Sequence, residues 1–376
     1  MSVDPDFLIE ALTRWNYFPN QKSKGGELPP VFSTRQFTPH VATLLLAEKL
    51  RSGGYDQVEY YATRYNNVSR PLAIPHPVGY AHLVHCICSH WSELDYICEN
   101  ETSLIKPEKH PDGRVVVMDY EGPLERTTRT LKIAFGKQFR AHTDITNFFP
   151  SVYSHAIPWA SVGFDYAKAH APQKDPTFKK LWFNQLDFNQ RMIKRNETQG
   201  VAIGPATSNV VSEAILARID EALSQKYKYY RYIDDYTCYC ETYEEGERFL
   251  RELNDQLRKY KLSLNLKKTE LVELPAPIDD DWVVELSTRM PAGSPNSPDT
   301  GKHYNAGEAL RFLDFAVQLK KRSPDGSVLK FAVKSIIYQL HELAVQPVLE
   351  YLLNLCRFYP LLLPLLEDLF AHGSIT

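Results

Sequence analysis

The 376-residue chain has no long apolar run and almost no net charge. Its 43 lysines and arginines nearly balance 46 aspartates and glutamates, so global charge neither favours nor excludes a nucleic-acid partner. No apolar stretch approaches the roughly 20 residues that span a bilayer, and Asp4, Asp6 and Glu10 interrupt the start where a signal peptide would be apolar. We therefore expect a cytoplasmic protein that makes no use of a membrane.

Cysteine is scarce, and its spacing is not that of a zinc site. The chain has six cysteines, and two pairs of them have C-x-C spacing, where zinc sites have two to four residues between ligands. A crowd of His and Cys between His82 and His90 also lacks a recognised ligand spacing, so a helix buried on one face is favoured there. The glycine loop at Gly200 and Gly204 is not followed by Gly-Lys-Ser/Thr, so nothing supports a nucleoside triphosphatase.

The stretch Tyr229–Cys240 carries two runs of aromatic and β-favouring residues on either side of Asp234 and Asp235. This pattern predicts a short β-hairpin with the acidic pair at its tight turn. Adjacent carboxylates repel each other unless a cation compensates them. Because hard divalent cations take oxygen ligands, the hairpin indicates a magnesium site; the alternative is a solvated Asp-Asp turn.

Further elements surround this hairpin. A strand ending in Asp144 would deliver a third carboxylate, and a loop with Gly200 lets the backbone approach a ligand closely. Helices are predicted near residues 208–223 and 244–260, with a strand near the end of residues 262–275. The mixed order of strands and helices predicts an α+β fold, with helices packed on one face of a sheet.

The C-terminal part has a different character. Residues 291–304 are rich in Pro, Ser, Gly and Asn and are predicted to be a linker. Helical stretches are predicted near 305–321, 327–344 and 346–372, with helix starts at Pro347 and Pro360. The apolar run 361–366 must be buried among these helices, on the sheet or against another subunit.

Four segments together resemble the reverse transcriptases. They correspond in order to motifs A to D of that family: Asp144–Phe149, Gln199–Pro205, Tyr232–Asp235 and Asn265–Thr269. Arg70–Pro77 is similar to the segment that opens the polymerase region, so the resemblance covers about residues 60–280. Four motifs in the family's order are far more specific than one.

The resemblance implies a right-hand polymerase architecture. Its expected parts are an N-terminal helical segment (1–60), fingers and palm (61–290), the linker (291–304) and a C-terminal helical domain (305–376) in place of a thumb. The fold class is therefore an α+β fingers and palm followed by an all-α, helical-repeat-like segment.

The chemistry that the resemblance implies is transfer of deoxynucleotides (dNTPs) to a primer hydroxyl with two Mg²⁺ ions, or Mn²⁺ as an alternative. Asp144 and Asp234 would bridge both metals, Ile145 would offer a backbone carbonyl, and Asp235 would support them. These three aspartates are the expected catalytic residues.

Other residues are implied to bind the nucleotide. Phe149 would exclude a ribose 2′-hydroxyl, Gln199 and Gly200 would line the nucleotide and template side, and Lys268 would face the triphosphate. Arg140 and Arg70 are candidates for phosphate contacts. The alternatives are a core aromatic for Phe149 and solvent-exposed side chains for Lys268 and the arginines.

Residues 148–160 and the helix-rich tail resemble the bacterial abortive-infection and defence-associated reverse transcriptases. Retron enzymes are the runner-up, although their Asn-Ala-x-x-His and Val-Thr-Gly boxes are missing. The implied partners are dNTPs, an RNA template or associated non-coding RNA, a DNA product, and a second copy through the C-terminal helices. The primer would be RNA, DNA or a protein tyrosine such as Tyr338, Tyr351 or Tyr359.

Two hypotheses from other classes remain open. One is a catalytically silent RNA-binding scaffold, which has no physical need for three metal-binding carboxylates. The other is a metal-dependent phosphohydrolase, which would leave the segments at Gln199 and Lys268 unexplained.

Overall fold

The computed structural model describes residues 3–18, 33–63, 68–118, 123–277, 280–291, 303–324 and 327–372. The chain divides into two compact units: the first comprises Met1–Tyr60 and Leu72–Ala276, and the second Tyr61–Pro71 and Pro277–Thr376. Residues 1–60, expected to be a separate segment, thus group with the sheet-bearing part of the chain. The predicted linker lies mostly outside the described residues.

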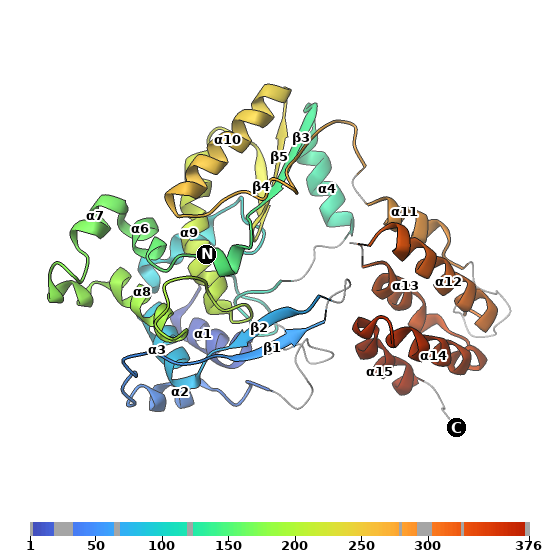
Figure 1. Ribbon diagram of the computed structural model, residues 1–376, viewed down its shortest axis with the longest axis horizontal. Helices are drawn as coiled ribbons and strands as arrows, with labels where there is room; N and C mark the ends of the chain where they lie inside the picture. Colours follow the sequence, from blue (N-terminus) through green and yellow to red (C-terminus); the bar gives the residue numbers. More distant parts are fainter. Residues whose placement is uncertain are drawn as a thin grey trace. The chain divides into compact units, whose positions relative to one another are not determined.

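A four-stranded antiparallel sheet forms the centre of the first unit (Figure 1). Its strand order is β4-β5-β3-β6, with β3 (Phe139–Asp144) and β5 (Asp235–Cys240) in the middle and β4 (Tyr229–Tyr232) and β6 (Glu270–Glu273) at the edges. The predicted strand at Asp144 and the predicted hairpin are both present, side by side. Such direct pairing brings segments distant in sequence to one sheet face.

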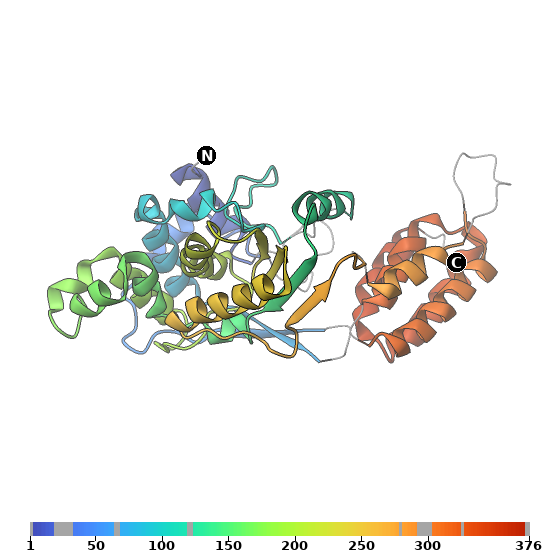
Figure 2. The same ribbon diagram turned by 90° about the horizontal axis from the view of Figure 1, so that it is seen from above.

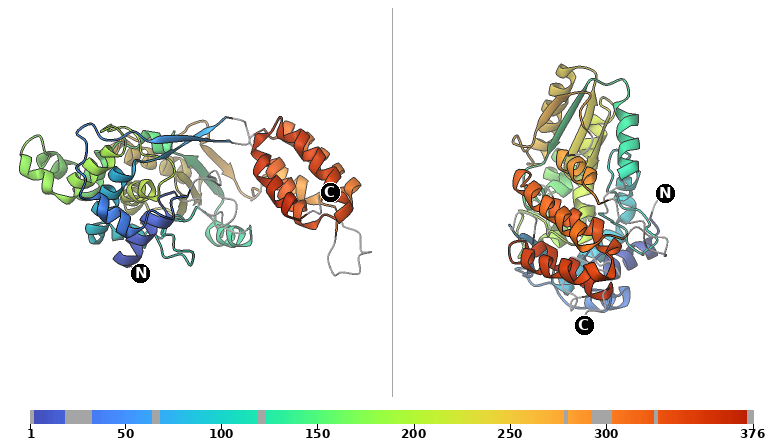
Figure 3. Two further views of the ribbon diagram at one scale, coloured as in Figure 1. Left: turned by 90° about the horizontal axis from the view of Figure 1, so that it is seen from below. Right: turned by 90° about the vertical axis from the view of Figure 1, so that its right-hand side faces the viewer.

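Helices cover the two faces of this sheet unequally. The ring of Tyr229 packs on Phe249 of α10 (Tyr243–Lys259), and Arg129 of α4 (Pro123–Ala134) lies over the ring of Tyr230. Because Tyr229 and Tyr230 are neighbours in a strand, α10 and α4 lie on opposite faces (Figures 1 and 3). Helix α9 (Ala206–Leu223) packs against α10, so α9 and α10 back the same face.

Helix α10 follows directly from its sequence. Apolar residues at helical spacing give it a buried stripe of Phe249, Leu253 and Leu257. Its N-cap Thr242 accepts a hydrogen bond from the backbone N–H of Glu245 at 3.2 Å. This stripe is what fixes α10 against the sheet.

The remaining elements of the first unit are mostly helical. Before β3 these are α1 (Pro5–Glu10), the π-helix η1 (Ala11–Trp15), α2 (Pro39–Leu45), α3 (Pro77–Ser89), and the 3-10 turns η2 (Trp91–Glu93) and η3 (Asp95–Glu99). Strands β1 (Val58–Ala62) and β2 (Arg70–Ile74), parts of which belong to the second unit, pair as a separate two-stranded sheet.

Between β3 and α9 the chain forms a further group of helices: α5 (Phe148–Ser151), α6 (Ala156–Val162), α7 (Phe164–Ala169), the 3-10 turn η4 (Pro176–Lys180) and α8 (Trp182–Met192).

The second unit contains a helical bundle (Figure 2). Its elements are α11 (Asp281–Thr288), α12 (Ala306–Arg322), α13 (Val328–Ile336), η5 (Ile337–Gln339), α14 (Glu342–Cys356), η6 (Pro360–Leu362) and α15 (Leu363–His372). Leu362, Leu365 and Leu366 are buried in its core, so the apolar run is covered within these helices.

One predicted helix boundary in this unit is wrong. Pro347 lies inside α14 and does not start it. The start is at Glu342 because the side chain of His341 accepts a hydrogen bond from the N–H of Leu343 and caps the helix. Within the described ranges, every helix is too short or too polar to cross a membrane.

Candidate active site

The turn between β4 and β5 is a two-residue turn made of Ile233 and Asp234. Ile233 adopts a φ of +54°, which a β-branched residue rarely does and which costs on the order of 1–3 kcal/mol. Only Asp234 therefore lies in the turn, where the sequence predicted both aspartates. Asp235 is the first residue of β5, paired with Tyr232 on one side.

On its other side, Asp235 faces Asp144. The register of β3 with β5 places these two aspartates directly opposite each other, and the N–H of Ile145 donates to the carbonyl of Asp234 at 3.2 Å. Directly opposed residues share a sheet face, so both carboxylates lie on the face away from α9 and α10. The three predicted catalytic aspartates thus meet at one end of the two central strands.

Lys268 reaches this cluster from a loop after α10. Its Nζ lies 2.5 Å from Oδ2 of Asp144, and this contact raises the pKa of Lys268. The loop is bonded to the end of β3, because the N–H of Asn265 donates to the carbonyl of Asp144 and the N–H of Thr146 donates to that of Ser263. The Lys268 side chain is 64% exposed, so its ammonium can leave the carboxylate without disturbing the core.

The electrostatics of the cluster favour a cation. Burial, with Asp235 and Asp144 nearby, raises the pKa of Asp234 from 3.8 to about 7. Burial also raises the pKa of Asp235, while neighbouring His142, which bonds Thr237 through Nδ1 at 3.0 Å, opposes that rise. His142 was not among the predicted residues. A positive ion would restore the charged form of both carboxyls.

The donor chemistry of the site fits a hard divalent cation. Oδ1 of Asp144 is buried and has no hydrogen-bond partner among the described residues. In those same residues, no three His, Cys, Asp or Glu side chains gather closely enough to hold an ion by themselves, and this includes the His and Cys of α3. Mg²⁺ is usually held by one or two carboxylates together with substrate phosphates, so an open donor set of this kind suits it.

The predicted nucleotide-side residues lie in two loops that bond to each other. The N–H of Gly200 donates to the carbonyl of Val152 at 2.7 Å, and the N–H of Val201 donates to that of Phe149 at 2.9 Å. Nε2 of Gln199 donates to the carbonyls of Pro150 and Ser151 at 3.1 and 3.0 Å. These bonds place Gln199 and Gly200 beside the segment that follows Asp144.

Gly200 has a positive φ of +83°, and a Cβ there would lie 2.7 Å from Nζ of Lys194 and 3.1 Å from the carbonyl oxygen of Pro150. Only glycine fits without a shift. The Phe149 side chain is buried, with its ring centroid 5.2 Å from that of Phe148.

The two predicted phosphate-binding arginines lie in different units. Arg140 is on β3, on the same strand face as His142 and Asp144. Arg70 is on β2 and belongs to the second compact unit, not to the unit that carries the carboxylates.

A buried ion network holds the hairpin from behind. Arg231 of β4 is fully buried and bonds both oxygens of Glu213, at 2.7 and 2.8 Å, and Oδ2 of Asp220 at 2.7 Å. Its Nη1 also donates to the carbonyl of Ile233 at 2.8 Å, which supports the strained residue of the turn. The sequence analysis missed this network. The available signal was weak: Glu213 and Asp220 are seven residues apart, so they lie on one face of α9 among mostly apolar neighbours.

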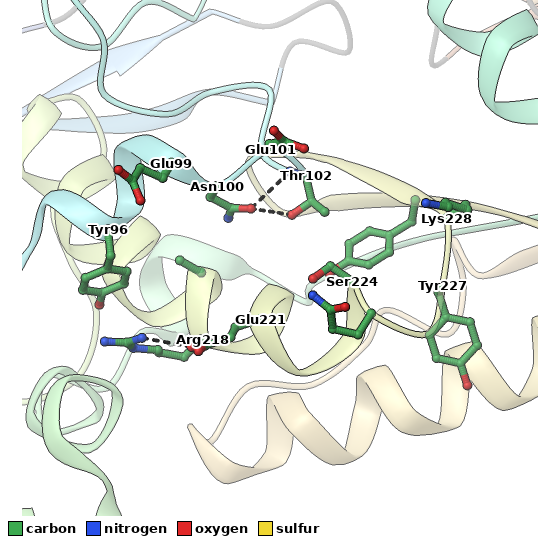
Figure 4. A pocket seen from close by; sticks show the side chains of 13 residues that line it. Tyr96, Glu99, Asn100, Glu101, Thr102, Arg218, Glu221, Ser224, Tyr227 and Lys228 are labelled. Carbon is green, nitrogen blue, oxygen red and sulfur yellow. Dashed lines mark hydrogen bonds and ion pairs between the residues drawn. The ribbon is translucent and has the colours of Figure 1, made fainter. Parts of the chain in front are cut away.

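The network reaches a separate cavity of about 600 Å³ between η3, the end of α9 and the start of β4 (Figure 4). Asn100 and Tyr229 line this cavity and both donate to Asp220, at 2.7 and 2.9 Å. Arg218 lies over the ring of Tyr96 in the same wall. None of the three aspartates predicted to be catalytic lines this cavity.

The part of the chain that carries the four-stranded sheet matches a known protein family. Residues 126–286 match the family model described as reverse transcriptase (RNA-dependent DNA polymerase). The match begins in α4, ends in α11 and includes all four strands of the sheet. Over these residues the chain is similar to the reverse transcriptases. The predicted fold class, reverse-transcriptase-like α+β with a helical C-terminal part, is confirmed.

Two solved structures of apo telomerase from Candida tropicalis are similar to this chain. One shares 10% identity at a TM-score of 0.39 over 61% of this chain and 45% of the telomerase chain. The other, truncated from the C-terminal domain, shares 12% at a TM-score of 0.36 over 64% and 56%. The chain spans about half the length of each telomerase chain. No curated protein matches it.

Proposed function

We propose that this protein is a DNA polymerase of the reverse-transcriptase kind that transfers dNTPs to a primer hydroxyl with two Mg²⁺ ions. The observation that carries the proposal is the placement of Asp144 directly opposite Asp235, with Asp234 in the adjoining turn. The buried, unpartnered Oδ1 of Asp144 supports it, because such an atom is otherwise unfavourable.

In this proposal Asp144 and Asp234 hold the metals, with the carbonyl of Ile145, and Asp235 lies beside them. When bound, the metals would lower the pKa of the primer hydroxyl and stabilise charge on the triphosphate. The ammonium group of Lys268 leaves the carboxylate of Asp144 and binds a phosphate oxygen of the incoming nucleotide instead. Phe149 excludes the ribose 2′-hydroxyl, and Gln199 and Gly200 line the nucleotide and template side. Arg140, on the same strand face as Asp144, contacts a phosphate.

The biological role that we propose is bacterial antiphage defence. It is supported by the resemblance of residues 148–160 and the helix-rich tail to the abortive-infection group. Synthesis would be templated by RNA, or untemplated with a protein tyrosine as primer, and a second copy would bind through the C-terminal helices.

The test is incorporation of labelled dNTPs by the full chain with Mg²⁺, beside an Asp234→Asn variant. Each protein is assayed with and without a primed RNA template, and the products are treated with protease. We expect incorporation by the native chain and none by the variant. Product that needs the primed template indicates RNA copying, and protease-sensitive product formed without it indicates protein priming.

No incorporation under any of these conditions, from folded protein, would contradict the proposal. Co-purified RNA in that case would favour a silent RNA-binding scaffold. Equal incorporation by native protein and Asp234→Asn would show that the product comes from a contaminant.

A further inference from the structure

Three aromatic rings follow one another along the first unit, starting just after the catalytic strand. The ring centroids of Tyr153 and Trp159 are 5.5 Å apart, and those of Trp159 and Phe164 are 5.0 Å apart. Nζ of Lys261 lies 3.9 Å from the Tyr153 ring centroid, and Nζ of Lys168 lies 5.5 Å from that of Phe164. We call these five residues the ring-lysine row.

The outer members of the row are accessible. Phe164 is 51% exposed, both lysines are exposed and Tyr153 is half-buried, whereas Trp159 is buried beneath them. Phe164 thus exposes an aromatic side chain beside the ammonium group of Lys168, and a planar, negatively charged partner can bind to such a pair. The row thus offers ring faces and ammonium groups side by side.

Charge in this part of the chain is opposite in sign to that of the whole. Residues 153–195 contain seven lysines and arginines against three aspartates, a formal +4 in a chain whose net charge is −3. One of those aspartates, Asp187, is already engaged with His155 and Arg191. A second, Asp175, caps η4 by accepting from the N–H of Thr177. The segment is therefore complementary to a polyanion.

The row begins beside the candidate active site. Tyr153 pairs with Gln199 in an isolated bridge, and the N–H of Ser154 donates to the carbonyl of Thr198. At the same end, Lys261 directly precedes the segment that bonds to the end of β3. From there the row runs along α6 and into α7, at the edge of the first unit (Figures 1 and 2).

We propose that the ring-lysine row binds the unpaired RNA template strand next to the active site. Bases stack on exposed aromatic rings with about 1–3 kcal/mol each and little sequence preference, while lysines pair with the phosphates. The two lysines that lie over the rings turn to the phosphates, and the ring faces then receive bases. The proposal relies on the proposed function only for the identity of the strand.

The test is binding of a fluorescein-labelled single-stranded RNA to the full chain, measured by fluorescence anisotropy without dNTPs. Phe164→Ala with Lys168→Gln should weaken binding about tenfold or more, and should lower the slope of log Kd against log salt by about one. The matched control is Tyr243→Ala with Lys259→Gln on α10, where the ring is 47% exposed and the lysine is also exposed. This control should bind RNA as the native chain does.

Several outcomes would overturn the proposal. These are native affinity in the row variant, equal weakening in the control, tighter binding of duplex than of unpaired RNA, and a preference for single-stranded DNA over RNA. If the double variant melts at a lower temperature than the native chain, Lys168→Gln alone still tests the salt slope. Because the assay needs no catalysis, Asp234→Asn should bind RNA normally, so failure of polymerisation is distinguishable from failure of this surface.

Discussion

Replacing Arg231 with methionine would leave two buried carboxylates without their cation. Glu213 and Asp220 are only 3% and 1% exposed, and both are bonded by the Arg231 guanidinium. Neither can be hydrated where it lies, because α9 and the sheet enclose the pair. The stability of this variant therefore measures how much the hairpin depends on the ion network of Arg231, Glu213 and Asp220.

The expected loss is large. Removing one partner of a buried ion pair costs about 3–5 kcal/mol, because the remaining charge stays desolvated. That is a large share of the about 5–15 kcal/mol by which a domain is stable. The matched control is Arg251→Met on α10, whose pair with Glu247 is 67% and 46% exposed and should be worth about 0.3–0.5 kcal/mol.

A triple variant separates stability from positioning. Arg231→Met with Glu213→Leu and Asp220→Asn leaves no charge in the network, and the asparagine still offers an acceptor for Tyr229. We expect it to be more stable than Arg231→Met alone, because apolar replacement of a buried ion network is often neutral or stabilising. It does not restore the 2.8 Å bond to the carbonyl of Ile233, so dNTP incorporation should stay low.

The assay is urea unfolding followed by far-UV circular dichroism, beside dNTP incorporation. The reasoning is refuted if Arg231→Met loses no more stability than Arg251→Met, or if the triple variant is no more stable than the single one. Full incorporation by the triple variant would show that the turn does not need the Arg231 bond.

Three further outcomes are expected. The fold raises the pKa of Asp234 from 3.8 to about 7, so the folded state favours its neutral form. About 4 kcal/mol of stability that is present below pH 3.8 should therefore be lost from the metal-free protein as the pH rises to about 7. Urea unfolding across that pH range measures the loss, and Asp234→Asn should abolish it. Lys268→Met should leave the stability within about 1 kcal/mol of native, because the lysine is exposed. The variant should incorporate less dNTP but bind Mg²⁺ more tightly, because a cation that competes for Asp144 has been removed. Calorimetric titration with Mg²⁺ in the absence of dNTP measures this affinity, and weaker binding would contradict competition between Lys268 and the metal. Gly200→Ala should lower the stability by about 1–2 kcal/mol, because φ is +83° and the carbonyl oxygen of Pro150 is close. A thermal unfolding midpoint equal to the native one would show that an alanine side chain fits there without strain.

Local patterns in the sequence were enough to predict the hairpin, the strand at Asp144 and helices α9 and α10. Each depends on periodicity or turn chemistry within a few residues, as the stripe of α10 does. The acidic pair was also recognisable, but the sequence did not show that Asp234 lies in the turn while Asp235 begins β5. This arrangement requires a positive φ at Ile233, which β-branched residues disfavour and which the surrounding fold imposes.

Features that need pairing over long distances were not predictable. The register that sets Asp144 against Asp235 and the contact of Lys268 with Asp144 join segments that share no local pattern. Arg231 looked like one more residue of a strand, because its partners lie on another element. The start of α14 was misplaced since Pro347 suggested a boundary, whereas the cap at His341 decided it.

The position of β3 in the sheet has a consequence for how the chain is made. β3 ends at Asp144, but its two neighbouring strands begin only at Asp235 and Glu270. During synthesis the central strand therefore waits with both edges unpaired while its first neighbour is still being translated. Such non-local pairing is slow to form and prone to intermolecular strand addition. The carboxylates meet only late in translation, and a nascent chain stalled before Glu270 would present the second edge of β3 to other strands.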